Sequence, residues 1–248
     1  MSRGSIDSSM RRFVLGVIPA RGGSKGIPRK NLARLGGRPL IEYTVEAARA
    51  SGRLSRIIVS TDDPEISAAA RELGAEVPFL RPASLAGDDT PMLDVLVDLL
   101  ASLVTREGYH PDVLVLLQPT SPFRRAEHID AAIDLLISSG ADSVVTVVTV
   151  PHQFTPGSLL ELNGDRLTPL MDARPATRRQ DKPRLLARNG PAVLAIRTAV
   201  ITKQNSLYGS DVRGLVMGRE ESFDIDDPFD LELAELLMTA REARRSLT

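Results

Sequence analysis

The sequence predicts a layered α/β fold in which helices cover a mostly parallel β-sheet. Short runs of β-branched and aliphatic residues alternate with longer segments whose apolar residues recur every three or four positions. One short run, DVLVLLQP at 112–119, is apolar almost throughout, which is typical of a strand buried on both faces of a parallel sheet. The 248-residue length fits one large domain, which we expect to span 13–248.

The expected elements follow one another through the chain. Proline in the first turn marks the helix at 39–51, and Gly74 closes the helix at 64–74. The helix at 90–104 has an apolar stripe at three- and four-residue spacing. Two more helices are expected at 126–140 and 228–245. Strands are expected at 13–18, 56–61, 75–80, 112–119, 142–150, 191–197 and 212–218.

The alternation stops after Val150, where a segment rich in proline, glycine and charge begins. We interpret the region at about 150–190 as an insertion that serves as a lid, a dimerisation arm or part of a substrate pocket. Within it, LNGD at 162–165 is typical of a hairpin turn, because Asn-Gly supplies the positive φ values that such turns require. Residues 1–12 are polar and are expected to form a flexible N-terminus.

Composition excludes several classes of function. The net charge of −1 gives no global field for nucleic acid or a membrane surface, and no apolar run approaches the ~18 residues of a membrane helix. The chain has no cysteine, which excludes disulfides and thiolate sites, and its three histidines are far apart. We therefore expect a cytoplasmic protein with no nucleic-acid or membrane partner.

The stretch VIPARGGSKGIPRKN, at 17–31, combines a strand end, glycines and cations. Glycines let backbone N–H groups approach oxygen atoms, and lysine and arginine neutralise negative charge, so the pattern suggests a phosphate cradle. The spacing is neither that of a Walker A loop nor that of a dinucleotide fingerprint. The alternative is a glycine turn followed by solvated charges.

Three further segments bear on a ligand site. QPTSPFR at 118–124 follows the most buried strand, where ligands bind in open α/β sheets, although it could also be a proline-stiffened turn. Asp224 and Asp226 are two apart, so their carboxylates can share one hard cation, while Asp227 would cap the next helix. The alternative is that all three are turn and cap residues.

The third segment lies within the insertion. Between Arg174 and Arg188 there are six cations against one acid, which suggests an anionic ligand or else a solvated loop.

Taken together, the motifs resemble those of the acylneuraminate cytidylyltransferase family. The resemblance is carried over 13–237 by IPARGGSKGIPRKN, RIIVSTDDPEI, LRPASLAGDDT, LLQPTSPFR, ARNGPAVLAI and SFDIDD. It implies a Rossmann-like nucleotidyltransferase fold, a three-layer sandwich, and a homodimer whose insertion reaches the partner's active site. It also implies transfer of CMP from CTP, with Mg²⁺, to the anomeric hydroxyl of a nonulosonic 2-keto sugar acid, releasing pyrophosphate.

The resemblance assigns roles to individual residues. Arg21, Lys30 and Asp226 would be catalytic, and Asp224 and Asp226 would hold the metal ion. The acceptor would bind to Gln118, Arg179 and Asn189. The nucleotide would bind to Arg21, Gly22, Gly23, Ser24, Lys25, Lys30, Asn31, Arg81 and Gln118. Phosphoryl-type transfer needs mainly positioning and charge neutralisation, and these residue types supply both.

The acceptor half departs from the family pattern. Sialic acid enzymes commonly read Asn-Gly-Ala-Ile-Tyr where this chain has Asn189-Gly190-Pro191-Ala192-Val193, and the lysine often found after residue 150 is missing. Two alternatives are therefore kept open beside a sialic, legionaminic or pseudaminic type of acceptor. One is a cytidylyltransferase for a small anion such as a phosphonate, and the other is a nucleotide-binding regulator without catalysis.

Overall fold

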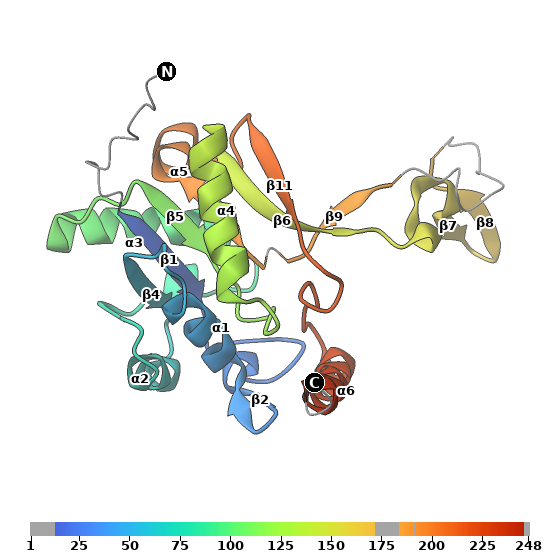
Figure 1. The fold of residues 1–248 in the computed structure, drawn as a ribbon, viewed down its shortest axis with the longest axis horizontal. Helices are drawn as coiled ribbons and strands as arrows, with labels where there is room; N and C mark the ends of the chain where they lie inside the picture. The colour runs from blue at the N-terminus through green and yellow to red at the C-terminus, as the bar shows by residue number, and fades with distance from the viewer. Residues whose placement is uncertain (1–12, 172–183, 191, 246–248) are drawn as a thin grey trace, which may run out of the picture.

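The computed structural model describes residues 13–171, 184–190 and 192–245, and its centre is a seven-stranded sheet (Figure 1). The strand order is β11-β6-β10-β5-β1-β4, and β9 pairs with β6 beyond this path. The strands of this sheet are β1 Val14–Pro19, β4 Arg56–Ser60, β5 Val113–Leu116, β6 Ser143–Thr149, β9 Leu186–Arg188, β10 Leu194–Arg197 and β11 Val212–Val216.

The sheet is mostly parallel, as the sequence predicts. β1 pairs in parallel with β4 and β5, and β11 pairs in parallel with β6. β10 is antiparallel to both of its neighbours, β5 and β6. The direction of β10 follows from the excursion at 150–190, which returns the chain to the sheet from the end at which β6 leaves it.

Helices cover both faces of the sheet, which gives the expected three layers. One face carries α1 Leu40–Arg49, α2 Pro64–Glu72 and α4 Ala126–Ser139, whose apolar side chains join one core cluster. The other face carries α3 Met92–Glu107 and α5 Thr198–Gln204, which contribute to a second cluster. Within the described residues, no helix is long and apolar enough to cross a membrane.

The prediction of a strand at 75–80 is wrong. The segment 75–80 makes only an isolated bridge, between Glu76 and Ile58 of β4. Pro78 has no N–H to continue a ladder. The chain then passes to Arg81, whose N–H donates to the carbonyl oxygen of Thr61. The short helix α5 and the strand β9 were not predicted, because each is too short to carry a clear periodicity.

The insertion stands away from the sheet as an arm (Figure 1). It carries an antiparallel hairpin, β7 Leu160–Asn163 and β8 Arg166–Pro169. The predicted turn is there, but Asn163 is the last residue of β7 and pairs with Arg166, so the two-residue loop is Gly164-Asp165. Only Gly164 has a positive φ, of 67°. The prediction that Asn-Gly together supply positive φ values is therefore corrected to glycine alone.

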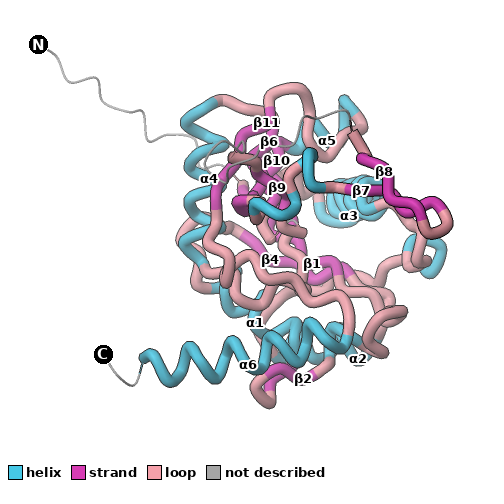
Figure 2. The backbone as a smooth tube through the Cα atoms, turned by 90° about the vertical axis from the view of Figure 1, so that its right-hand side faces the viewer, coloured by secondary structure: helices cyan, strands magenta, loops and turns pink. Residues whose placement is uncertain are grey.

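A third core cluster joins elements that lie outside the sheet. It contains Ile27 of the glycine loop, Phe123 after β5, Ile225 between the two acids and Ala234 of α6 Pro228–Arg245. The short hairpin of β2 Arg34–Leu35 and β3 Arg38–Pro39 lies beside α6 (Figure 2). The cluster therefore connects three of the four segments that the sequence assigns to the ligand site: the glycine loop, the segment after β5 and the acidic segment.

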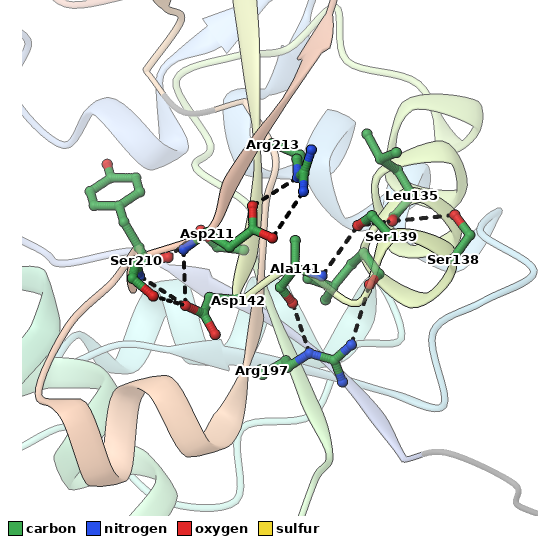
Figure 3. Close-up of polar contacts among 12 residues, drawn as sticks. Leu135, Ser138, Ser139, Ala141, Asp142, Arg197, Ser210, Asp211 and Arg213 are labelled. Carbon is green, nitrogen blue, oxygen red and sulfur yellow. Dashed lines mark hydrogen bonds and ion pairs between the residues drawn. The ribbon is translucent and has the colours of Figure 1, made fainter.

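The opposite end of the sheet is held together by Asp142 (Figure 3). One oxygen of its carboxylate, Oδ2, accepts hydrogen bonds from the backbone N–H groups of Ser210 at 2.8 Å and Asp211 at 3.0 Å. These bonds hold the start of β11 beside β6 and keep the pKa of Asp142 below its usual range. Nearby, Arg197 donates to the carbonyl oxygens of Ala141 at 2.7 Å and Leu136 at 3.4 Å.

Gly209→Ala is expected to destabilise this end of the sheet by about 2–3 kcal/mol. Gly209 has φ +73°, and an added Cβ would lie 2.5 Å from the Cβ of Asp142. Gly140→Ala is the matched control, because Gly140 has φ +72° but open space around it, and we expect a loss of about 1 kcal/mol. Urea unfolding of both variants measures the difference. Equal losses would show that contact with Asp142 does not matter.

Candidate active site

A pocket of about 420 Å³ opens beyond the carboxyl ends of the neighbouring parallel strands β1 and β5. It gathers most of the residues that the sequence assigns to the nucleotide and to the metal ion, from four separate segments. Those that line it are Arg21, Ser24, Lys25, Lys30, Asn31, Arg81, Gln118 and Asp226. Met92, at the start of α3, also lines the pocket and was not predicted.

Gly22 and Gly23 lie in the glycine loop, but neither is one of the described residues that line the pocket. The N–H of Gly22 donates to Oδ1 of Asp62 at 3.0 Å, so that donor is already engaged. A Cβ at Gly22 would lie 2.7 Å from Oδ2 of Asp63, whereas a Cβ at Gly23 would meet nothing within 4 Å. Gly22 is therefore needed for packing against the start of α2, a reason different from the predicted approach to phosphate.

Two cations of the glycine loop are paired with one carboxylate. Arg21 Nη1 lies 2.6 Å from Oδ1 of Asp88, and Lys25 Nζ lies 2.9 Å from Oδ2. Hydrogen bonds from Lys25 and Arg21 hold the pKa of Asp88 below its usual range. Asp88 thus occupies the position of an anion between the two cations. Sequence reasoning missed this residue, because nothing in LRPASLAGDDT distinguishes Asp88 from Asp89.

Asp88→Asn is expected to tighten binding of a nucleoside triphosphate by about three- to tenfold at low salt, because phosphate oxygens no longer compete with the carboxylate. Titration calorimetry with CTP, at 50 and at 300 mM salt, measures the change and its screening. Asp89→Asn is the control and is expected to bind CTP as the native chain does. Weaker binding by Asp88→Asn would instead show that Asp88 holds the two cations in their binding positions.

Lys30 and Asn31 connect the glycine loop to other parts of the site. Lys30 Nζ donates to the carbonyl oxygen of Ile225 at 3.0 Å and to Oδ1 of Asp226 at 3.2 Å. Asn31 is buried, and its side-chain amide donates to the carbonyl oxygen of Arg21 at 2.9 Å. Lys30 therefore touches the acidic segment directly, and Asn31 holds the backbone of the loop.

Arg81 and Gln118 form the side of the pocket next to the sheet. Arg81 is only 8% exposed, and its guanidinium donates to the side-chain and carbonyl oxygens of Ser60 at the end of β4. Burial lowers the pKa of Arg81. Gln118 follows Leu117 directly after β5, as predicted for a ligand residue at the carboxyl end of a strand.

The two acids have different surroundings. Asp224 accepts a hydrogen bond from Ser121 Oγ at 3.1 Å, and burial raises its pKa, with the nearby charge of Asp226 adding to the effect. Asp226 is exposed and lines the pocket. Asp227 accepts a bond from the N–H of Asp230 at 3.0 Å, and so caps α6, as the sequence predicts.

This donor set fits Mg²⁺, which is commonly bound by one or two carboxylates together with substrate phosphates and water. Among the described residues there is no group of three or more acidic or histidine side chains that could hold a metal ion without such help.

The predicted acceptor residues are less well gathered. Asn189 is buried and is not one of the described residues that line the pocket. Its side-chain amide donates a hydrogen bond to Ser222 Oγ at 2.9 Å. Its Oδ1 has no hydrogen-bond partner within the described part of the chain. Arg179 lies outside the described residues, as does most of the cationic cluster at 174–188. Of that cluster, Arg188 packs over the ring of Tyr208 at 4.9 Å.

A comparison with protein families decides the class of the chain. A family model described as cytidylyltransferase matches residues 15–208, which include every segment of the pocket except the acidic one. The chain belongs to this cytidylyltransferase family. The chain is thus a nucleotidyltransferase, an enzyme class that needs little covalent help from the protein.

Individual relatives of this cytidylyltransferase differ in length. It is 35% identical to the CMP-N,N'-diacetyllegionaminic acid synthase of Legionella pneumophila, over 91% of this chain and 96% of that protein. It is 32% identical to the N-acylneuraminate cytidylyltransferase of Escherichia coli over 91% of this chain, but spans only 52% of that protein. The solved structure of CMP:2-keto-3-deoxy-manno-octonic acid synthetase complexed with CTP has the same fold, with a TM-score of 0.69 and 20% identity over 92% of this chain and 99% of that one.

Proposed function

We propose that this enzyme transfers CMP from CTP to the anomeric hydroxyl of a nonulosonic 2-keto sugar acid, with release of pyrophosphate. The observation that carries the proposal is Lys30, which contacts Asp226 within a pocket that also contains Arg21 and Lys25. In this proposal Arg21, Lys25 and Lys30 bind phosphate, and the carboxylates of Asp224 and Asp226 suit a hard cation. The names of the Legionella and Escherichia relatives support the sugar-acid class of acceptor.

In this proposal the hydroxyl oxygen of the acceptor attacks the α-phosphorus of CTP, the bond to the β-phosphate breaks, and the hydroxyl proton passes to solvent or base. Arg21, Lys25 and Lys30 neutralise charge on the departing pyrophosphate. Asp224 and Asp226 would hold Mg²⁺, which supplies further neutralisation of phosphate charge when bound. A single direct displacement needs no nucleophilic side chain, and trapping of a covalent nucleotidyl-enzyme would contradict it.

The phosphonate alternative is less well supported than the sugar acid. The arginine cluster at 174–188 favours it, but most of that cluster lies outside the described residues. The small side chain at Val193 favours it as well, but Val193 is fully buried in the core cluster under α1 and α4. Its size therefore shapes the core and not the pocket. The regulator alternative is disfavoured by the intact contact between Lys30 and Asp226.

We also propose a homodimer formed through the arm. Large apolar side chains lie exposed on it, which is uncommon on a monomer and typical of an interface. They are Phe154, Leu160, Leu162, Leu167, Leu170 and Met171. Sedimentation analysis is expected to show a dimer for the native chain and a monomer after Leu162→Asp and Leu167→Asp are combined. A native monomer at 10–50 times the assay concentration would contradict the proposal.

Pyrophosphate release with CTP, Mg²⁺ and a panel of acceptors tests the function. The panel contains N-acetylneuraminate, legionaminate, pseudaminate, 3-deoxy-octulosonate and small phosphonates. Release with one sugar acid establishes the proposed reaction, and release only with phosphonates replaces the acceptor class. Tight CTP binding without release from any acceptor would favour the regulator.

A further inference from the structure

Arg124 is a charged side chain in the interior of the protein. It belongs to the loop that follows β5, and it is only 3% exposed. Burial lowers its pKa to about 9, so the guanidinium remains charged near neutral pH. Within the described residues, its Nε and Nη2 have no hydrogen-bond partner. A buried charge without a paired carboxylate costs several kcal/mol, so its position calls for an explanation beyond packing.

Its hydrogen bonds join two segments of the site. The same nitrogen, Nη1, donates to the carbonyl oxygen of Gln118 at 3.0 Å and to that of Ala192 at 2.9 Å. Gln118 lines the nucleotide pocket, whereas Ala192 lies two residues before β10 and three residues after Asn189. Arg124 thus connects the loop that faces the nucleotide to the segment assigned to the acceptor.

The acidic segment also lies close to Arg124. Ser121, three residues before Arg124, donates to Asp224, and Asp224 is the carboxylate whose charge acts on Arg124. A Cβ at Gly190 would lie 3.4 Å from both Ser121 Oγ and Asp224 Oδ2. The loop after β5, the segment before β10 and the acids therefore meet around one guanidinium, although they are far apart in the chain.

We propose that Arg124 is a positioning residue that sets the distance between the nucleotide loop and the acceptor segment, and so determines how the acceptor hydroxyl meets the α-phosphate. The kinetic part of this inference rests on the proposed function. Misplacement of reacting groups by about 1 Å can reduce a rate about 100-fold. Loss of Arg124 therefore affects acceptor binding and turnover more than it affects binding of CTP.

The kinetic experiment compares three variants of the full chain. Arg124→Met is expected to raise the KM for the acceptor at least about tenfold and to lower kcat about 100-fold, with the KM for CTP changed less than about threefold. Arg124→Lys keeps a cationic donor for two carbonyl oxygens and is expected to recover at least a tenth of the native kcat/KM.

Arg197→Met is the control, because Arg197 also donates to two backbone carbonyl oxygens, at the other end of the sheet. It is expected to lose stability with unchanged KM values. Equal kinetic behaviour of Arg124→Met and Arg197→Met would overturn the proposal.

Hydrogen exchange followed by mass spectrometry tests the position itself and needs no turnover. In Arg124→Met, amide exchange is expected to rise at 118–125 and 192–194, with a smaller rise in Arg124→Lys and no such rise at these segments in Arg197→Met. Unchanged exchange at both segments would overturn the proposal even if the enzyme is active. If no acceptor gives pyrophosphate release with the native chain, the proposed function fails, and exchange alone decides the role of Arg124. If Arg124→Met does not fold, Arg124→Lys carries both measurements.

Discussion

Asp226→Ala is expected to lower kcat for pyrophosphate release by about a thousandfold or more. Asp226 lines the pocket, contacts Lys30 at 3.2 Å and lies close enough to Asp224 to raise its pKa. Its loss removes one of two carboxylates suited to Mg²⁺ and leaves Lys30 without its carboxylate contact. The effect should fall on turnover more than on stability, because the carboxylate is exposed.

Asp227→Ala is the matched control for this prediction. Asp227 is the next residue along the chain, but its carboxylate accepts from the N–H of Asp230 at the start of α6. Its loss is expected to cost about 1 kcal/mol of stability as a helix cap and to change kcat less than about threefold. Assays over a range of Mg²⁺ concentrations separate weaker metal binding from slower chemistry. Native activity in Asp226→Ala would show that the acid pair is not the metal site.

The sequence predicts those elements of the fold that are determined by residues close together in the chain, and it misses those that depend on contacts between distant segments. The strands β1 and β5 are predicted because burial on both faces leaves a continuous apolar run. The prediction of a strand at 75–80 is wrong because strand pairing depends on tertiary contacts, which the local sequence does not encode, and the segment makes only one bridge. The antiparallel direction of β10 is set by the path of the arm, which no local pattern encodes.

The same distinction applies to the site. The cations of the glycine loop are predicted because they lie within one short motif that follows a strand. The roles of Asp88 and Arg124 are not, because each depends on contacts with segments distant in the chain. The acceptor side is the least predictable part, since Asn189 is buried between segments and Arg179 lies outside the described residues.

Gly26→Ala is expected to reduce kcat/KM for CTP at least about 100-fold. Gly26 lies in the glycine loop, and a Cβ built on it would approach the carbonyl oxygen of Asp226 to less than 3.0 Å. The obstructing atom belongs to the backbone, so no side-chain rotation relieves the clash. The loop must move away from the acidic segment, which separates Lys25 and Lys30 from Asp226 by an amount that can cost about 100-fold. Sequence reasoning missed Gly26 because its neighbour lies 200 residues further along the chain.

Gly23→Ala provides the comparison that makes the Gly26 result interpretable. Both glycines lie in the same loop, neither has a positive φ, and a Cβ at Gly23 would meet nothing within 4 Å. We therefore expect Gly23→Ala to keep kcat/KM within about threefold, because the two substitutions differ only in the space available. Urea unfolding of both variants separates a local displacement from a loss of folding. If the two variants had the same kcat/KM, close approach of the loop to Asp226 would not be required for activity. A selective loss in Gly26→Ala would show that the phosphate loop and the acidic segment act as one unit, held together by a contact that only glycine permits.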